Sequence, residues 1–350
     1  MTSLPPTLVV GCGLIGTSVA LALREHGIDV HLSDRDADHV AAAVERGAGS
    51  AEPVHDPALV VVAVPPRATA AAVREALEPY PAAVVTDVAS VKGSVAREVA
   101  GGAGLDRYVG SHPMAGSERS GPLAASARLF EGRPWVITPA AGATDAAVRL
   151  VEEVAVMLGA VPTVMDADTH DRAVALVSHV PQVLSTLTAA RLVDAPPAHL
   201  ALAGQGLRDV TRVAGSDPAL WRDIITTNAA EIGAVLTAVR DDLDTLIDAL
   251  RDRDVVGGVL EAGRVGTRAI PGKHGGEPVE LVVVNVQGPD TPGALSRLFA
   301  HVGESGVNIE DLRIDHELGR PVGLVEIAVA ADRADELVAR LTERAWSAYR

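Results

Sequence analysis

The chain has 350 residues, of which 48% are hydrophobic and 22% charged, and its formal net charge is −16. This size predicts two or three globular domains, and the negative charge without any basic run argues against nucleic acid or an anionic membrane as a partner. A single cysteine, Cys12, excludes an internal disulfide, and no cysteine or histidine spacing typical of a metal site occurs. Because we find no signal-like start and no uncharged apolar segment of about 18 residues, we expect a cytoplasmic protein without a transmembrane helix.

The first part of the chain alternates Val-rich runs with Ala-rich amphipathic runs. Near-continuous apolar strands separated by helices are typical of a buried, mostly parallel sheet. We therefore predict a Rossmann-type, doubly wound α/β domain over residues 1–166. Its strands are expected at 7–11, 29–34, 58–65, 83–88, 107–111, 134–139 and 161–166, and its helices at 14–27, 36–47, 67–79, 91–101 and 145–159.

The rest of the chain predicts two further domains. Residues 167–270 lose the strand pattern and show helical spacing of apolar residues, which indicates an all-helical substrate or dimerisation domain with helices at 168–193, 197–214, 217–251 and 254–269. A Gly- and Pro-rich stretch at 271–278 reads as a linker. Residues 279–350 follow a strand, helix, strand, strand, helix order, which predicts a small ferredoxin-like α+β domain.

A glycine-rich turn after the first predicted strand indicates a dinucleotide site. Gly11, Gly13 and Gly16, with Leu14 and Ile15 between them, form the pattern G-x-G-x-x-G at the start of a helix. The first glycine permits the tight turn, the second lets the backbone approach a pyrophosphate, and the third allows close packing of helix and strand. The alternative is a turn that binds nothing.

Asp34 ends the second predicted strand, where a carboxylate accepts hydrogen bonds from a ribose and repels a 2′-phosphate. This favours NAD over NADP, although the adjacent Arg35 could accommodate the phosphate. The other interpretation of Asp34 is a cap for the helix at 36–47. Val64 and Pro65 end the third strand, on the edge that lines the cofactor crevice in such sheets.

Polar residues follow the next two strands. Ser90 lies beyond the fourth strand, and His112 lies in "GSHPMAGSERSG" (110–121), which we interpret as an irregular loop after the fifth. A neutral histidine at this edge can accept a proton from an alcohol while a hydride leaves the same carbon, and a nearby serine could fix its tautomer. The alternative role for His112 is a loop cap.

The helical region offers further candidates. His179 lies near a Pro break, and Arg212 and Trp221 lie in the charged stretch "RDVTRVAGSDPALWRDI" (208–224). An arginine in such a stretch can bind a carboxylate through two hydrogen bonds. A salt-bridge network between helices would explain the same charges.

Taken together, these motifs resemble the prephenate/arogenate dehydrogenase family. The matching stretches are "GCGLIG", "VAVPP", "DVASVKG", "GSHPMAGSERSG", "SHVPQ" and "RDVTRVAGSDPALWRDI", in family order over residues 7 to 270. The C-terminal region resembles an ACT domain through "GPDTPGALSRL" and "SGVNIEDL". Domains of that kind bind amino acids, so the resemblance implies a homodimer with tyrosine as effector, or a tail that only dimerises.

The resemblance implies NAD-dependent oxidative decarboxylation of prephenate to 4-hydroxyphenylpyruvate in tyrosine biosynthesis. It implies that His112 assists deprotonation of the ring hydroxyl at C4 while Ser90 orients His112 and contacts the nicotinamide side. Arg212 would pair with the ring carboxylate, and His179 would lie at the substrate's side-chain end. The resemblance also implies pocket roles for Glu118 and Trp221, and we take Ser117 and Gln182 as further candidate substrate contacts.

Three alternatives remain. Arogenate carries an amine where prephenate has a keto group, and the uncharged Gln182 beside His179 mildly favours the keto acid. A non-catalytic sensor would bind NAD and an amino acid without turnover, which His112, Ser90 and Arg212 argue against. A hydroxyacid or imine reductase of similar layout would favour a catalytic Lys or Asp where this chain has His179.

Overall fold

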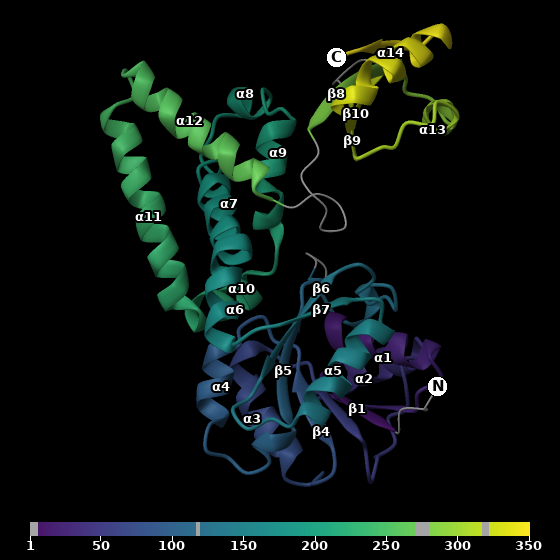
Figure 1. Ribbon diagram of the computed structural model, residues 1–350, viewed down its shortest axis with the longest axis vertical. Coiled ribbons are helices and arrows are strands. Elements are labelled where there is room, and N and C mark those ends of the chain that lie inside the picture. The colour runs from purple at the N-terminus through teal and green to yellow at the C-terminus, as the bar shows by residue number, and fades with distance from the viewer. Residues whose placement is uncertain (1–5, 117–119, 271–279, 317–321) are drawn as a thin grey trace. The chain divides into compact units, whose positions relative to one another are not determined.

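The computed structural model describes residues 6–116, 120–270, 280–316 and 322–350 (Figure 1). The chain divides into two compact units, residues 1–243 and 244–350, and each is described here by itself. The linker predicted at 271–278 lies outside the described residues.

The first unit is built on a seven-stranded sheet in the order β2-β1-β3-β4-β5-β6-β7. All neighbouring strands pair in parallel except β5 and β6, which are antiparallel. The chain leaves β1 toward β2 and returns on the other side of β1 as β3, so the topological switch point lies between β1 and β3. Ligands of such sheets bind at the carboxyl ends of these strands. The strands are β1 (Thr7–Val10), β2 (Val30–Ser33), β3 (Leu59–Val62), β4 (Val84–Asp87), β5 (Tyr108–Pro113), β6 (Pro134–Pro139) and β7 (Val161–Val164).

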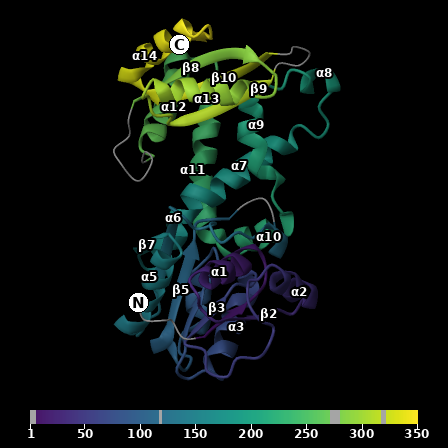
Figure 2. The ribbon, with the colours of Figure 1, turned by 90° about the vertical axis from the view of Figure 1, so that its right-hand side faces the viewer.

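Helices cover both faces of this sheet, as the two views in Figures 1 and 2 show. One buried apolar cluster joins the sheet to α1, α2 and α5, and a second joins it to α3 and α4. This two-faced burial explains the near-continuous apolar strands and confirms the predicted doubly wound fold. The helices are α1 (Leu14–Glu25), α2 (Ala37–Glu45), α3 (Pro66–Leu77), α4 (Gly93–Val99) and α5 (Asp145–Met157), with short 3₁₀ turns at Leu105–Arg107 and Pro122–Ala124.

The interpretation of residues 110–121 as a loop was wrong at its start. Strand β5 continues through His112 to Pro113, and His112 is paired with Val136 of the antiparallel strand β6. The sequence carries no sign of this pairing, because β6 lies more than 20 residues farther along the chain. The pairing fixes the backbone of His112 in the sheet.

The helical region of the first unit is more broken than predicted. It comprises α6 (Ala167–Val174), a π-helical turn (Ala175–His179), α7 (Val180–Ala190), α8 (Pro197–Leu200), α9 (Gln205–Thr211), a 3₁₀ turn (Arg212–Gly215), α10 (Pro218–Thr227) and most of α11 (Ala229–Asp248). The π-helical turn ends two residues before Pro181, whose ring has no N–H and would clash with the carbonyl four residues earlier. The widened turn accommodates the proline and places His179 at its end.

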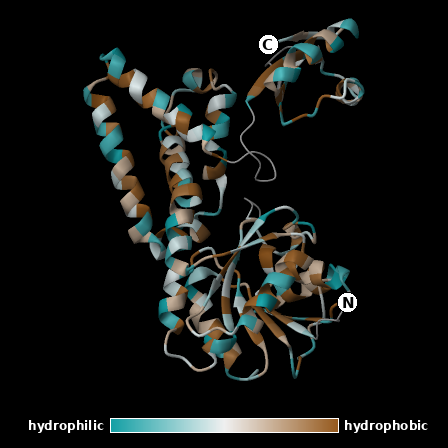
Figure 3. Cartoon of the chain, viewed as in Figure 1, coloured by the Kyte–Doolittle hydropathy of each residue, from teal (hydrophilic) through white to brown (hydrophobic). Residues whose placement is uncertain are grey.

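The segment Ala167–Ala190 contradicts the expectation that the chain has no uncharged apolar stretch of about 18 residues. Residues 173–190 contain no Asp, Glu, Lys or Arg, and the segment is long and apolar enough to cross a membrane by length and composition alone. Its start packs against α4 and β6, and His170, Asp171 and His179 are buried. Apolar side chains such as Leu176, Val177 and Leu187 are exposed on the same segment, and Figure 3 shows hydrophobic colouring along α7.

The second unit contains a four-stranded antiparallel sheet in the order β11-β8-β10-β9, and Figure 2 shows β8, β10 and β9 side by side. Alternate residues of β8 and β10 pack on α13 and α14 to form the core. The predicted ferredoxin-like fold is therefore confirmed, and β11, which the sequence did not suggest, is the final strand that completes it. The elements are α12 (Arg253–Arg268), β8 (Leu281–Pro289), α13 (Ala294–Glu304), β9 (Asp311–His316), β10 (Val322–Ala330), a 3₁₀ turn (Ala331–Arg333), α14 (Ala334–Glu343) and β11 (Ser347–Tyr349).

Candidate active site

The glycine-rich turn between β1 and α1 has the geometry of a dinucleotide loop. Gly11 has a φ of +104°, and a Cβ there would lie 2.3 Å from the carbonyl oxygen of Ala63. A Cβ on Gly16 would lie 1.9 Å from the carbonyl oxygen of Gly11. A Cβ on Gly13, in contrast, would meet no atom within 4 Å. The turn therefore leaves room in front of the first amides of α1, where a pyrophosphate fits.

Asp34 directly follows β2 and lies beside the glycine-rich turn. Its carboxylate accepts hydrogen bonds from the backbone N–H of Cys12 at 2.6 Å and of Asp36 at 2.9 Å, which ties β2 to the glycine-rich turn. The N-cap of α2 is Asp36, so the interpretation of Asp34 as that cap was wrong. Burial and the Asp34 charge raise the pKa of the Cys12 thiol to about 12, so this cysteine is a protonated, apolar filler.

The remaining predicted cofactor residues lie on the same edge of the sheet. Strand β3 ends at Val62, earlier than the predicted residue 65, so Val64 and Pro65 lie just beyond it, and Pro65 is the N-cap of α3. Arg35 is exposed beside Asp34, and Ser90 is partly buried beyond β4. Leu14 and Ile15 form the partly buried first turn of α1.

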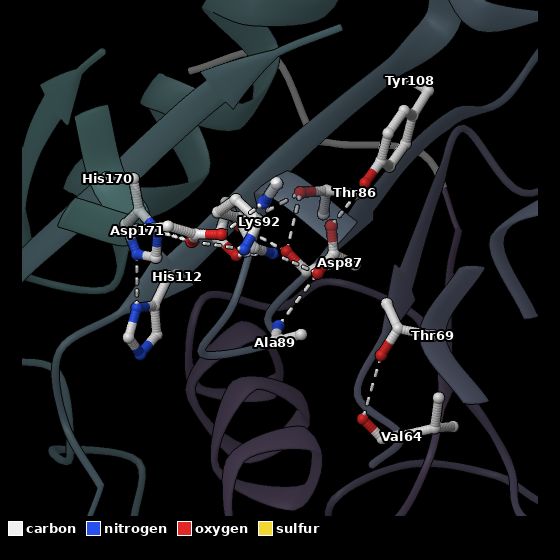
Figure 4. Close-up of polar contacts among 12 residues, drawn as sticks. Val64, Thr69, Thr86, Asp87, Ala89, Lys92, Tyr108, His112, His170 and Asp171 are labelled. Atoms are coloured by element: carbon white, nitrogen blue, oxygen red, sulfur yellow. Dashed lines mark hydrogen bonds and ion pairs between the residues drawn. The ribbon is translucent and has the colours of Figure 1, made fainter. Parts of the chain in front are cut away.

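His112 is connected to two buried residues of α6, as Figure 4 shows. Its Nδ1 lies 2.9 Å from Nε2 of His170, and Nδ1 of His170 lies 2.8 Å from Oδ1 of Asp171. Asp171 also accepts hydrogen bonds from the backbone N–H of Lys92 and of Gly93, both at 2.8 Å. The partner of Nδ1 of His112 is therefore His170, and among the described residues no hydrogen bond joins Ser90 to His112.

A buried ion pair between Lys92 and Asp87 links the carboxyl end of β4 to β5. The ammonium of Lys92 donates to Asp87 and, at 2.6 Å, to the carbonyl oxygen of Ser111. Asp87 also accepts from the hydroxyl of Tyr108 at 2.7 Å and from the N–H of Ala89 at 2.9 Å. Because Lys92 and Asp87 are both fully buried, their mutual pairing offsets the cost of removing each charge from water.

The surroundings keep His112 neutral. Burial, together with the neighbouring His170, Lys92 and His179, holds the pKa of His112 well below its ordinary value of 6.5. The pKa of Asp171 is also lowered: burial raises it, but hydrogen bonds from His170, Lys92 and Gly93 outweigh that effect. A neutral imidazole therefore stands near a carboxylate, which is the state that a general base requires.

His179 is linked to Asp171 through Asn228. Its Nδ1 is 3.2 Å from Nδ2 of Asn228, and Asn228 also donates to the carbonyl oxygen of Asp171 at 2.9 Å. Burial lowers the pKa of His179 to about 4, so its ring is neutral near pH 7. The indole of Trp221 stands edge-on to His179 with ring centroids 6.0 Å apart.

Arg212 and Gln182 are placed by the turn after α9. The Gln182 amide donates to the carbonyl oxygen of Val213 at 2.8 Å, which ties α7 to the segment that carries Arg212. Arg212 is exposed and forms no ion pair with any residue that the structure describes. The salt bridges of this region are instead those of Asp223 with Arg67 at 3.0 Å and with Arg222 at 3.6 Å. The two predicted pocket residues Ser117 and Glu118 lie outside the described residues.

Comparison with known proteins identifies the family. Residues 19–164 match the prephenate dehydrogenase nucleotide-binding domain, residues 166–257 its dimerization domain, and residues 280–317 an ACT domain. A protein of Streptomyces niveus, described as a probable prephenate dehydrogenase, is 38% identical over 97% of this chain and 98% of its own length. The chain belongs to the prephenate dehydrogenase family.

Solved structures of this family resemble the fold. A prephenate dehydrogenase of Aquifex aeolicus in complex with hydroxyphenyl propionate and NAD⁺ has a TM-score of 0.70 and 26% identity, over 77% of this chain and 99% of that one. An arogenate dehydrogenase of Synechocystis has a TM-score of 0.63 and 26% identity, over 76% of this chain and all of that one. The solved relatives therefore include one enzyme named for prephenate and one named for arogenate.

Sequence reasoning missed part of the buried polar group of this prephenate dehydrogenase family member. No role was assigned from the sequence to Asp87, Lys92, His170 or Asp171. An available signal was the adjacent pair His170–Asp171 just before the uncharged apolar run 173–190, because polar residues that become buried require partners.

Proposed function

We propose that the protein is a prephenate dehydrogenase that uses NAD to convert prephenate to 4-hydroxyphenylpyruvate and carbon dioxide in tyrosine biosynthesis. The observation that carries the proposal is the position of a neutral His112 at the carboxyl end of the sheet, on the edge that also holds the glycine-rich turn. A basic imidazole nitrogen beside a dinucleotide crevice is suited to oxidation of an alcohol.

The chain's residues divide the work of binding and proton transfer. Gly11, Gly13 and Gly16 would hold the pyrophosphate of NAD and Asp34 its ribose. Bound NAD supplies the acceptor for the hydride that leaves C4. His112 accepts the hydroxyl proton at C4 as the carbonyl forms. Loss of carbon dioxide from C1 then leaves its electron pair in the ring, which becomes aromatic, so the protein's task is mainly positioning.

The substrate's charged and polar ends are assigned to the helical region. Arg212 pairs with the ring carboxylate through two charge-assisted hydrogen bonds. His179, neutral and beside Trp221, faces the side-chain end, and Gln182 holds the Arg212 segment in place. Ser117 and Glu118 belong to the same pocket by family resemblance.

The test is formation of reduced cofactor by the purified protein, followed by absorbance, with prephenate or arogenate and with NAD or NADP. Turnover of prephenate with NAD is the expected result. Turnover of arogenate alone would keep the chemistry and change the substrate. Cofactor binding without turnover of either compound would support the sensor and overturn the proposal.

Asp34 provides a prediction about the cofactor. Asp34→Ala removes the carboxylate that contacts the ribose and repels a 2′-phosphate, so we expect the preference for NAD over NADP, as the ratio of kcat/KM values, to fall about 10- to 100-fold. Asp38→Ala removes an exposed charge from the same region and should leave the ratio unchanged. An unchanged ratio in Asp34→Ala would assign cofactor choice elsewhere.

The exposed apolar side chains of the helical region support a homodimer. Leu176, Val177 and Leu187 are 57–65% exposed on one segment, and the region's own buried cluster is small. A second copy of the chain would cover such a face, in keeping with the dimerization domain that this region matches. The protein would then be a cytoplasmic dimer that needs no membrane.

Tyrosine is the effector that we propose for the second unit. A cavity of about 340 Å³ lies between the end of β8, the loop before α13 and the ring of Trp346, and Ser296 is among its lining residues. Ser296→Trp should fill the cavity and raise the tyrosine concentration for half-maximal inhibition at least about tenfold, with activity unchanged when tyrosine is absent. Ala300→Trp, exposed on the same helix, is the matched control. Equal inhibition of both variants would instead indicate competition by tyrosine at the active site.

A further inference from the structure

The contacts of Asp171 set the direction of the hydrogen bonds that reach His112. Its two carboxylate oxygens accept from the backbone N–H groups of Lys92 and Gly93, so this side chain acts as an acceptor. The third contact, with Nδ1 of His170, therefore places a proton on that nitrogen. With one ring proton at Nδ1, Nε2 of His170 carries a lone pair.

The same reasoning continues to His112. Because Nε2 of His170 accepts, Nδ1 of His112 must carry the proton of their 2.9 Å hydrogen bond. The other ring nitrogen, Nε2 of His112, is then unprotonated. A carboxylate two hydrogen bonds away thus fixes the tautomer in which His112 can accept a proton from substrate.

We propose that His170 and Asp171 form a proton relay behind His112, an inference that rests on the proposed function. When Nε2 of His112 takes the proton from the C4 hydroxyl, the N–H bond at Nδ1 of His112 breaks and a new N–H bond forms at Nε2 of His170. The positive charge then lies on His170, beside the Asp171 carboxylate, and His112 is neutral again.

The charges around the two rings favour this transfer. A positive charge on His112 is disfavoured by burial and by the nearby His170, Lys92 and His179, as the lowered pKa of His112 reflects. Lys92 is paired with Asp87, and the pair of Arg97 with Asp168 at 3.6 Å is exposed. Asp171 is the carboxylate in contact with His170, so the relay moves the proton toward the negative charge of the site.

His170→Gln separates a relay from simple orientation. Glutamine can present a carbonyl oxygen where Nε2 lies and so accept from His112, but it cannot take up a proton. In single turnovers with prephenate and NAD, we expect the rate of NADH formation to fall about 10- to 100-fold with substrate affinity nearly unchanged. The dependence of the rate on the D₂O fraction should change from curved, as for two moving protons, to linear, as for one. Asp168→Asn on the same helix is the control and should behave as wild type.

Two results would overturn the relay. One is a wild-type rate in His170→Gln; the other is a slower variant whose dependence on D₂O fraction keeps the wild-type curve, which would indicate orientation alone. A readout without substrate separates this test from the proposed function. Nitrogen-15 NMR of the wild-type protein with bound NAD should show the His112 ring protonated at Nδ1 and unprotonated at Nε2, whichever substrate is turned over. The opposite tautomer would contradict the inference.

Discussion

His112→Asn is expected to lower kcat for prephenate by about 10² or more while KM changes far less. The variant removes the nitrogen that accepts the C4 hydroxyl proton, and no other described side chain at this strand end is assigned that role. Asparagine is polar and close in size, so it should preserve β5 and its pairing with β6. Steady-state kinetics with prephenate and NAD measure the effect.

The control for this variant is His55→Asn, because His55 is an exposed histidine outside the strands and helices. It should retain wild-type kcat. A His112→Asn enzyme with more than half of the wild-type kcat would contradict the assignment of the base.

The pH dependence of kcat in the wild-type enzyme also tests whether His112 is the base. His112 must be neutral to accept a proton, and its pKa lies well below 6.5, so protonation abolishes activity only in acid. We expect kcat to stay level as the pH falls from 7.5 to 6.5 and to decline below that range.

Arg212→Ala is expected to raise the KM for prephenate about 10- to 100-fold with a smaller change in kcat. The estimate corresponds to the loss of hydrogen bonds between a guanidinium and a carboxylate. Arg212 is exposed and has no ion-pair partner in the described structure, so the substitution breaks no salt bridge that would confuse the result.

Arg208→Ala is the matched control for this effect. Arg208 is an exposed arginine of the preceding helix α9, so its removal changes the net charge equally. Its KM for prephenate should remain within about twofold of wild type, as expected for an exposed charge. Equal increases in both variants would mean that general charge, rather than a specific pairing, attracts the substrate.

Much of the fold was predictable because local patterns determine it. Val-rich runs such as 58–65 correspond to buried strands, here β3, and the spacing of Gly11, Gly13 and Gly16 predicted the turn that the structure contains. Ends of elements were less predictable. The strand continued through His112 because a distant strand pairs with it, and the π-helical turn depended on how one proline is accommodated inside a long helix.

In the candidate site, too, some features were predictable from the sequence and others were not. The placement of His112, Ser90 and Asp34 on one edge was predictable because strand ends meet at one edge of a parallel sheet. The partner of His112 was not, since His170 lies 58 residues away on a helix whose packing against the sheet no local pattern specifies. Serine was the nearer candidate in sequence, and the structure instead brings α6 beside β5.

Transfer of deuterium from C4 of prephenate tests the central claim most directly. Prephenate labelled with deuterium at C4 would be incubated with the enzyme and NAD, and the reduced nicotinamide and the released carbon dioxide would be measured together. We predict one deuterium in the reduced cofactor for each carbon dioxide released. Carbon dioxide release with the deuterium in solvent, or reduced cofactor without label, would contradict hydride transfer from C4.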